Sequence, residues 1–178
     1  METPPLVLRV LARAEAEDMG SSCQADVGAL LHVLAARRGL VRAAEIGTGA
    51  GGAAAWIVSA LQPQLPFFTA EPDLDLAARA AELFADDPNV VVLPGPWRAS
   101  LPAEAPFDLL FVDAPDAKDD VEAVVGLLAP GGTAVLGVLR SDPALQDARR
   151  DAWLYHPLLT TIELHLGSDR SALVAVRR

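Results

Sequence analysis

Short apolar segments alternate with helical segments along most of this sequence, and that alternation limits the possible folds more than any other feature. The predicted strands lie at 40–46, 66–70, 90–93, 107–112 and 133–139. The predicted helices lie at 6–16, 23–38, 53–61, 74–85, 118–128 and 143–151. Strands joined through helices run parallel, because a parallel pair needs a crossover connection. The sequence therefore predicts an α/β fold with a mostly parallel sheet and helices on both faces.

The last part of the sequence has a different pattern. Two further apolar segments, 160–166 and 172–177, flank the run Gly-Ser-Asp-Arg at 167–170, which has the composition of a turn. Strands joined so closely form an antiparallel hairpin. Added to five parallel strands, the hairpin predicts a seven-stranded sheet with an antiparallel edge.

The composition fits a packed globule with a large negative charge. Of the 178 residues, 52% are hydrophobic and 21% are charged, which argues against disorder. The formal net charge of −10 repels phosphate backbones and anionic lipids, so neither nucleic acid nor a membrane is expected as a partner. Cys23 is the only cysteine, and charged residues interrupt 1–20, so we expect no disulfide within the chain and no signal peptide. These features favour a cytoplasmic protein.

A glycine-rich turn stands between the first predicted strand and the helix after it. It has the sequence Glu-Ile-Gly-Thr-Gly-Ala-Gly at 45–51. Glycines there permit positive φ and let a ligand lie directly against the backbone, and the following helix offers amide groups to an anion. The signal is weak by itself. Gly47, Gly49 and Gly52 also satisfy the dinucleotide-binding pattern, and tight turns contain glycine without any ligand.

Two acidic residues at strand ends narrow the choice of ligand. Glu71 follows the second predicted strand, where a carboxylate can accept hydrogen bonds from both hydroxyls of a ribose. That position suits NAD and S-adenosylmethionine equally. Glu45 lies at the end of the first strand, and its charge favours a ligand with a cationic amino or sulfonium group, as in S-adenosylmethionine. The alternative for both acids is a solvated strand end with no ligand.

Four segments together resemble one family of enzymes. They are 44–51, 71–73, 107–114 and 127–132. With them, the chain from residue 24 onwards resembles the class I S-adenosylmethionine-dependent methyltransferases. It is most similar to the small-molecule O-methyltransferases related to catechol and caffeoyl-CoA methyltransferases. The resemblance implies a Rossmann-like methyltransferase fold in one domain, 1–178, with N-terminal helices in 1–39 and the core in 40–178.

The resemblance also implies where S-adenosylmethionine contacts the chain. The implied contacts are Glu45, Gly47, Thr48, Gly49, Glu71 and Asp113. The same loops add Gly51, Pro72, Gly95 and Trp97 to the predicted cofactor site. Trp97 lies near the position where the family often has an acidic residue beside the adenine. Its ring is either a stacking face for the adenine or a packing residue.

The sequence departs from the family at the metal site. Family members bind a divalent cation through an aspartate after the fourth strand and an Asp-Asn pair after the fifth. Asp113 matches the first position, but 135–139 contains no such pair, and the spacing of Asp142 does not fit. Mg²⁺ needs several oxygen ligands, and two of the family's three are missing. We therefore expect a methyltransferase that uses no metal ion.

No catalytic residue is assigned by the sequence, and three residues are candidates. Asp113 is one. Lys118 stands two positions later than the family's lysine, and we expect it on the surface at the start of a helix. His156 lies in a predicted loop and is either a base or a packing residue. The resemblance implies that residues 19–23, just before a predicted helix, form a further part of the site that faces the cofactor or the acceptor.

The activity expected from these features is methyl transfer from S-adenosylmethionine to an oxygen of a small molecule. Proximity and alignment can supply most of the rate of such a displacement. Two alternatives stay open, namely a cofactor-binding protein of the same fold that has lost catalysis, and a NAD-dependent reductase. The expected partner is a small-molecule acceptor. Because relatives often dimerise, a homodimer is possible.

Overall fold

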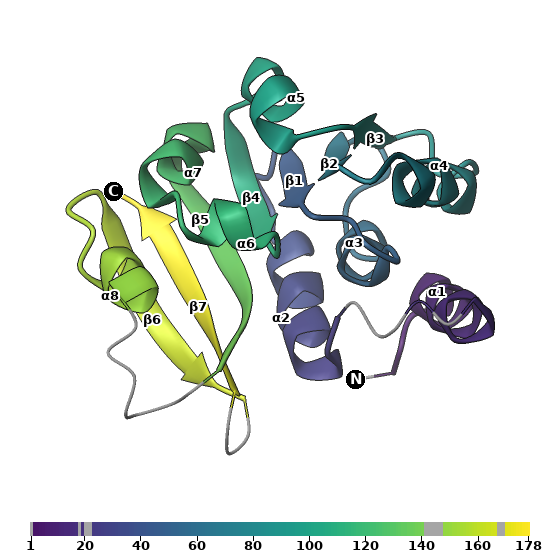
Figure 1. Cartoon of the computed structure of the whole chain (residues 1–178), viewed down its shortest axis with the longest axis horizontal. Coiled ribbons are helices and arrows are strands. Elements are labelled where there is room, and N and C mark those ends of the chain that lie inside the picture. Colours follow the sequence, from purple (N-terminus) through teal and green to yellow (C-terminus); the bar gives the residue numbers. More distant parts are fainter. Residues whose placement is uncertain (1, 18, 20–22, 141–147, 167–169) are drawn as a thin grey trace.

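Seven strands form one sheet, with helices on both of its faces (Figure 1). The computed structural model describes the whole chain except residues 1, 18, 20–22, 141–147 and 167–169. The strands are β1 (Ala43–Ile46), β2 (Phe67–Glu71), β3 (Val90–Pro94), β4 (Phe107–Val112), β5 (Leu128–Arg140), β6 (Leu159–His165) and β7 (Arg170–Arg177). The helices are α1 (Pro5–Ala16), α2 (Ala25–Ala35), α3 (Gly52–Val58), α4 (Leu74–Leu83), α5 (Trp97–Glu104), α6 (Pro115–Lys118), α7 (Val121–Leu127) and α8 (Ala148–Leu154).

The order of the strands is β3-β2-β1-β4-β5-β7-β6. The five strands from β3 to β5 run parallel, and β7 pairs antiparallel with both β5 and β6. The chain proceeds outwards from β1 to β3, then returns to the other side of β1 and continues outwards from β4 (Figure 1). The predicted sheet, with its C-terminal hairpin, is confirmed.

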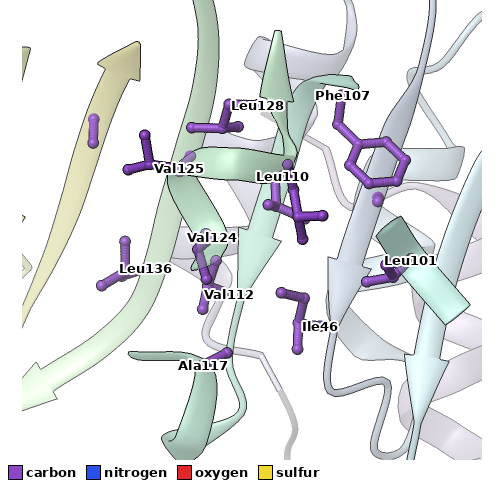
Figure 2. Close-up of a cluster of buried hydrophobic side chains, with 14 of the residues drawn as sticks. Ile46, Leu101, Phe107, Leu110, Val112, Ala117, Val124, Val125, Leu128 and Leu136 are labelled. Atoms are coloured by element: carbon purple, nitrogen blue, oxygen red, sulfur yellow. The ribbon is translucent and has the colours of Figure 1, made fainter. Parts of the chain in front are cut away.

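Two hydrophobic clusters cover the two faces of the sheet. Strand β4 lies at the centre, and its apolar sequence predicts the burial that the structure shows on both faces. Leu110 and Val112 face one cluster, to which α5 and α7 contribute (Figure 2). Trp153 of α8 belongs to the same cluster. Leu109 and Phe111 face the other cluster, to which α1, α2 and α3 contribute. The alternation of side chains along the strands therefore decides on which side each residue at a strand end lies.

Three segments differ from the sequence predictions. No helix was predicted at α5, which buries only Trp97 and Leu101 and contains Pro102, so it lacks a clear amphipathic pattern. The predicted helix 118–128 is two short helices, α6 and α7, and β5 begins at Leu128, where a turn was expected. The start of the predicted helix 143–151 lies outside the described residues. None of the helices in the described part of the chain is long and apolar enough to cross a membrane.

Candidate cofactor site

The carboxyl ends of β1, β2 and β4 meet at one edge of the sheet, where the winding of the chain reverses between β1 and β4. Ligands of open α/β sheets bind at such a reversal. Glu45 in β1 lies beside Thr69 in β2 and Phe111 in β4. Because side chains two residues apart share a face, Glu71 and Asp113 lie on the same face as Glu45. The site thus gathers three acidic residues on the face that α2 and α3 cover.

The loop from β1 to α3 needs glycine where the sequence has it. Gly47 has φ +94° and Gly51 has φ +82°, a conformation that residues with a side chain rarely adopt. A Cβ on Gly47 would lie 3.1 Å from the backbone nitrogen of Ala114, in the connection after β4. The fold itself therefore requires glycine at position 47, so this glycine alone is no proof of a ligand.

Glu71 joins the glycine loop to the loop after β2. The backbone N–H of Gly49 donates to its Oε2 at 2.8 Å, and the backbone N–H of Asp73 donates to its Oε1 at 3.1 Å. Each carboxylate oxygen has two lone pairs, so one on each is left for the hydroxyls of a ribose. Of the other predicted residues here, Pro72 is exposed, and the N–H of Gly95 donates to the main-chain oxygen of Glu71 at 2.8 Å.

A buried chain of hydrogen bonds holds Glu45. The Thr69 hydroxyl donates to Glu45 Oε2 at 2.7 Å, and the hydroxyl oxygens of Thr48 and Thr69 lie 2.5 Å apart. Burial raises the pKa of Glu45 well above its ordinary value; the hydrogen bond from Thr69 opposes this shift, and the charges of Asp113 and Glu71 add to it. A cation placed beside Glu45 would reverse the shift. The site therefore favours a positively charged ligand.

Lys118 forms an ion pair with Asp113. Its ammonium donates to Asp113 Oδ1 at 2.8 Å. Lys118 is 8% exposed and lies at the end of α6, so the prediction of a surface lysine at the start of a helix is wrong. The reason is local: the N–H of Lys118 donates to the main-chain oxygen of Ala114. One helical turn thus returns the lysine side chain to the end of β4.

Trp97 packs into the core on the other face of the sheet. The residue is 5% exposed and belongs to the cluster that α5 and α7 line. Its Nε1 donates to Asp116 at 2.9 Å, and the guanidinium carbon of Arg98 lies 4.3 Å from the ring centroid. Of the two roles left open for Trp97, these contacts support packing.

His156 lies at the opposite edge of the sheet. It precedes β6, which runs parallel to β1, so it stands near the amino ends of the parallel strands. Its Nε2 is 3.0 Å from Glu122 Oε1, and its Nδ1 accepts from the N–H of Leu158 at 3.2 Å. The structure therefore does not bring this candidate base to Glu45, Glu71 and Asp113.

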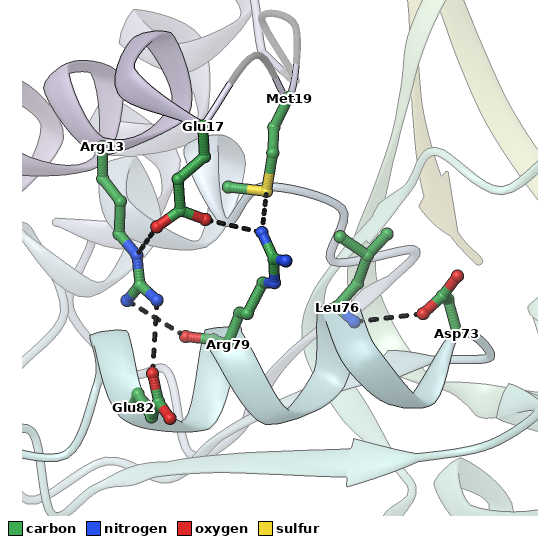
Figure 3. A network of polar contacts seen from close by, with 7 residues as sticks. All are labelled: Arg13, Glu17, Met19, Asp73, Leu76, Arg79 and Glu82. Atoms are coloured by element: carbon green, nitrogen blue, oxygen red, sulfur yellow. Dashed lines mark hydrogen bonds and ion pairs between the residues drawn. The ribbon is translucent and has the colours of Figure 1, made fainter.

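Ion pairs join the end of α1 to α4 (Figure 3). Arg13 and Arg79 both contact Glu17, at 2.9 and 2.7 Å. Arg79 also contacts the sulfur of Met19 at 3.7 Å. The two arginines and Met19 line a small hollow together with Gly49. This network fixes Met19, the start of the predicted site segment 19–23, next to the glycine loop.

The other end of that segment lies near the carboxylates. Burial raises the pKa of the Cys23 thiol to about 12, and the charges of Glu45 and Asp113 add to the shift. Residues 20–22 lie outside the described residues. Both described ends of the segment therefore border the candidate site.

The residues around Asp113 do not fit a divalent metal ion. One oxygen of Asp113 already accepts from Lys118. The neighbouring residue on β5 is Gly137, which offers no side-chain ligand; a Cβ there would lie 2.8 Å from Asp113 Oδ1. No group of three or more His, Cys, Asp or Glu side chains able to hold a metal occurs among the described residues, and Asp142 lies outside them. A hard cation needs several oxygen ligands at once.

Comparison with known proteins identifies the family. Residues 44–137 match a methyltransferase domain family. A Mycobacterium avium protein named as an O-methyltransferase is 36% identical over 155 residues, which cover 79% of this chain and 70% of the relative. The chain belongs to this methyltransferase family.

Solved structures agree with that assignment. The methyltransferase superimposes on cofactor-bound Rv0187 from MTB with a TM-score of 0.83 and 25% identity, over 99% of this chain and 91% of that one. It superimposes on the O-methyltransferase TomG from Streptomyces achromogenes, in complex with S-adenosylmethionine, with a TM-score of 0.76 and 25% identity, over 99% and 92% of the two chains. The predicted resemblance to class I S-adenosylmethionine-dependent methyltransferases is confirmed.

One residue of the site is absent from the sequence predictions. Thr69 connects Glu45 to Thr48 from the middle of the site. Its signal in the sequence is a hydroxyl inside the otherwise apolar segment Phe-Phe-Thr-Ala of β2. A buried hydroxyl needs a partner, but sequence alone does not show which residue lies opposite it in the neighbouring strand.

Proposed function

We propose that this methyltransferase transfers the methyl group of S-adenosylmethionine to an oxygen of a small-molecule acceptor, without a divalent metal ion. The cofactor follows from the family. The acceptor class and the independence from metal are the proposal. The observation that carries it is the set of three acidic residues, Glu45, Glu71 and Asp113, at the ends of neighbouring strands, with Glu45 buried and its pKa raised.

The acidic residues of the site favour S-adenosylmethionine over a dinucleotide. S-adenosylmethionine carries a sulfonium and an ammonium group, both of which are attracted by carboxylates. The pyrophosphate of NAD would instead bring two negative charges and no cation to this cluster of acidic residues, so it would disfavour the ionised form of the buried Glu45 instead of stabilising it. A NAD-dependent reductase is therefore disfavoured by the same residues.

Each residue of the site has a defined task in this proposal. Glu71 keeps a free lone pair on each oxygen for the ribose hydroxyls, and Thr69 and Thr48 fix the Glu45 carboxylate and the glycine loop. When bound, the cofactor supplies an activated methyl group on a cationic sulfur. The chain then aligns an acceptor oxygen with that methyl group and excludes water, which can account for most of the rate of a displacement.

Calorimetric titration tests the cofactor and the metal separately. We expect S-adenosylhomocysteine to bind the wild type equally with Mg²⁺ and with EDTA, and NADH not to bind. Glu71→Gln should weaken S-adenosylhomocysteine binding at least tenfold, since about 1.4 kcal/mol corresponds to a factor of ten. The matched control is Asp86→Asn, which removes an exposed acid in the segment after α4. Failure of S-adenosylhomocysteine to bind would refute the proposal.

Turnover distinguishes an active enzyme from a binding protein of the same fold. Purified protein with S-adenosylmethionine and a panel of phenols, catechols and hydroxy acids should release S-adenosylhomocysteine, and EDTA should not reduce the rate. Binding without turnover on every acceptor would contradict the proposed activity. The cytoplasmic location, the single domain over 1–178 and the homodimer rest on the sequence alone and stay predictions.

A further inference from the structure

The ion pair between Lys118 and Asp113 is buried unevenly. The Lys118 side chain is 9% exposed, whereas the Asp113 side chain is 37% exposed. The ammonium is therefore withdrawn from bulk water, and the carboxylate opens toward the edge of the sheet. If the ion pair were broken, water could reach the Asp113 carboxylate but not the Lys118 ammonium.

The stability of the fold does not explain why Lys118 is buried beside Asp113. The cost of removing an ammonium from water commonly offsets the attraction within a buried ion pair, and apolar residues of similar size are often as stabilising. Asp113, being more than one-third exposed, has access to water and does not depend on a lysine to satisfy it. A buried charge that the fold does not require points to a role in binding or chemistry.

The position of the ammonium agrees with such a role. In the proposed function Glu71 and Glu45 hold the cofactor at the ends of β2 and β1. The acceptor then approaches from the side of β4 and β5, the next strands of the sheet. On that side Gly137 has no side chain, and its backbone packs closely against Phe111 and Asp113, since an added Cβ would lie 2.8 Å from both Phe111 Cζ and Asp113 Oδ1. The Lys118 ammonium is bonded to that same oxygen.

We propose that the Lys118 ammonium, held in place by Asp113, binds the acceptor oxygen as an oxyanion and so serves as an internal cation where other enzymes use a metal ion. The inference rests on the proposed function and names its substrate class: molecules with an acidic hydroxyl, such as phenols and enols. Asp113 is the positioning residue, because it fixes the ammonium and does not itself touch the acceptor.

The chemistry of this step balances without a base from the chain. An ammonium has three N–H donors; one goes to Asp113, and another can donate to the acceptor oxygen. The acceptor hydroxyl loses its proton to water before the transfer. An electron pair of the oxyanion then forms the O–C bond as the C–S bond breaks, and the electrons of that bond remain on sulfur as a neutral thioether. Because Lys118 keeps its proton, the acceptor must ionise readily, which is why an acidic hydroxyl is required.

A coloured probe tests the internal cation without any turnover. 4-Nitrophenol is suitable because its phenolate absorbs at longer wavelength than the phenol. The protein is first saturated with sinefungin, a non-reactive analogue with an amino group at the position of the sulfonium. A nearby opposite charge typically lowers the pKa of an acid by about 1–3 units. We therefore expect the bound probe to ionise about 1–3 pH units below the free probe in the wild type.

Matched variants separate charge from packing. Lys118→Met keeps a long apolar side chain in the buried position and should return the ionisation of the probe to that of the free phenol, while sinefungin binds as before. Lys118→Arg keeps the positive charge and should retain most of the shift. Arg98→Gln is the control, because it removes an exposed cation that contacts Asp116 of the same short helix; it should match the wild type.

The possible results have distinct meanings. If sinefungin and S-adenosylhomocysteine fail to bind the wild type, the proposed function is overturned and this inference with it. If they bind but the spectrum of the probe is the same in wild type and Lys118→Met, or does not change on addition of either protein, only the internal cation is overturned. A shift that disappears in Lys118→Met and persists in Lys118→Arg and Arg98→Gln supports it.

Discussion

Replacing Glu45 with glutamine changes how the stability of the protein depends on pH. Glu45 is 1% exposed, and burial, together with the nearby charges of Asp113 and Glu71, holds the pKa of its carboxyl group well above the ordinary value. Glutamine has nearly the same size. Its side-chain oxygen can still accept from the Thr69 hydroxyl. The substitution therefore removes the titration while it leaves most of the packing.

The sign and size of the effect follow from proton binding. Between the ordinary carboxyl pKa and the raised pKa of Glu45, the folded protein holds a proton that the unfolded chain has released. The free energy of unfolding then falls as pH rises, by about 1.4 kcal/mol per pH unit for one such group. The stabilising contribution of Glu45 is complete below the unfolded pKa and is lost as pH rises through the folded pKa.

Urea unfolding of wild type and Glu45→Gln, measured at a series of pH values from acidic to neutral, checks this reasoning. The difference between the two free energies of unfolding should increase with pH in favour of the variant, at about 1.4 kcal/mol per unit within that window. Glu82→Gln, at an exposed acid, should run parallel to the wild type. Parallel profiles for Glu45→Gln as well would show that the buried carboxyl does not hold its proton, and the electrostatic description of the site would be wrong.

Three further substitutions probe the site and its surroundings. Gly47→Ala should destabilise the fold by roughly 1–3 kcal/mol and weaken S-adenosylhomocysteine binding, because Gly47 has a positive φ and the new Cβ would press against the backbone nitrogen of Ala114. The control is Gly39→Ala, which also has a positive φ but has open space around it, so it should cost less stability and leave binding intact. Thr69→Val removes both hydrogen bonds of a buried hydroxyl and should lower the free energy of unfolding in urea by roughly 1–3 kcal/mol. Calorimetry should show weaker S-adenosylhomocysteine binding. His156→Gln should lower thermal stability but leave S-adenosylhomocysteine affinity within twofold of wild type; a large loss of affinity would contradict its placement at the far edge of the sheet.

The fold was largely predictable, because its main elements repeat a strong pattern. The segment 107–112 was predicted with the bounds that β4 has, since a mostly apolar run bounded by Pro106 and Asp113 has few other interpretations. The hairpin of β6 and β7 was predicted from two apolar segments around a turn. Helix α5 could not be predicted in this way: it buries two side chains one turn apart and contains Pro102, so its helical state depends on packing against the sheet.

The site was predictable in outline but not in its contacts. Position in the chain identifies Glu45 and Glu71 as acids at strand ends, and the structure brings them together. The contact between Lys118 and Asp113, and the burial of Lys118, depend on a four-residue helix. Such a helix is too short to show a helical period in the sequence. His156 illustrates the opposite case. A loop histidine is a reasonable candidate base until the direction of β6 shows at which edge of the sheet it lies.

One carboxylate joins two loops of the cofactor site by hydrogen bonds. Glu71 accepts from Gly49 in the first loop and from Asp73, the residue that caps α4, in the second. A ligand that arrives there meets a surface whose shape is already set, so little conformational entropy is lost on binding. Amide hydrogen exchange offers a direct view of this pre-organisation: the N–H groups of Gly49 and Asp73 should exchange slowly even in the free protein. In Glu71→Gln, where one oxygen acceptor is lost, at least one of the two amides should exchange faster.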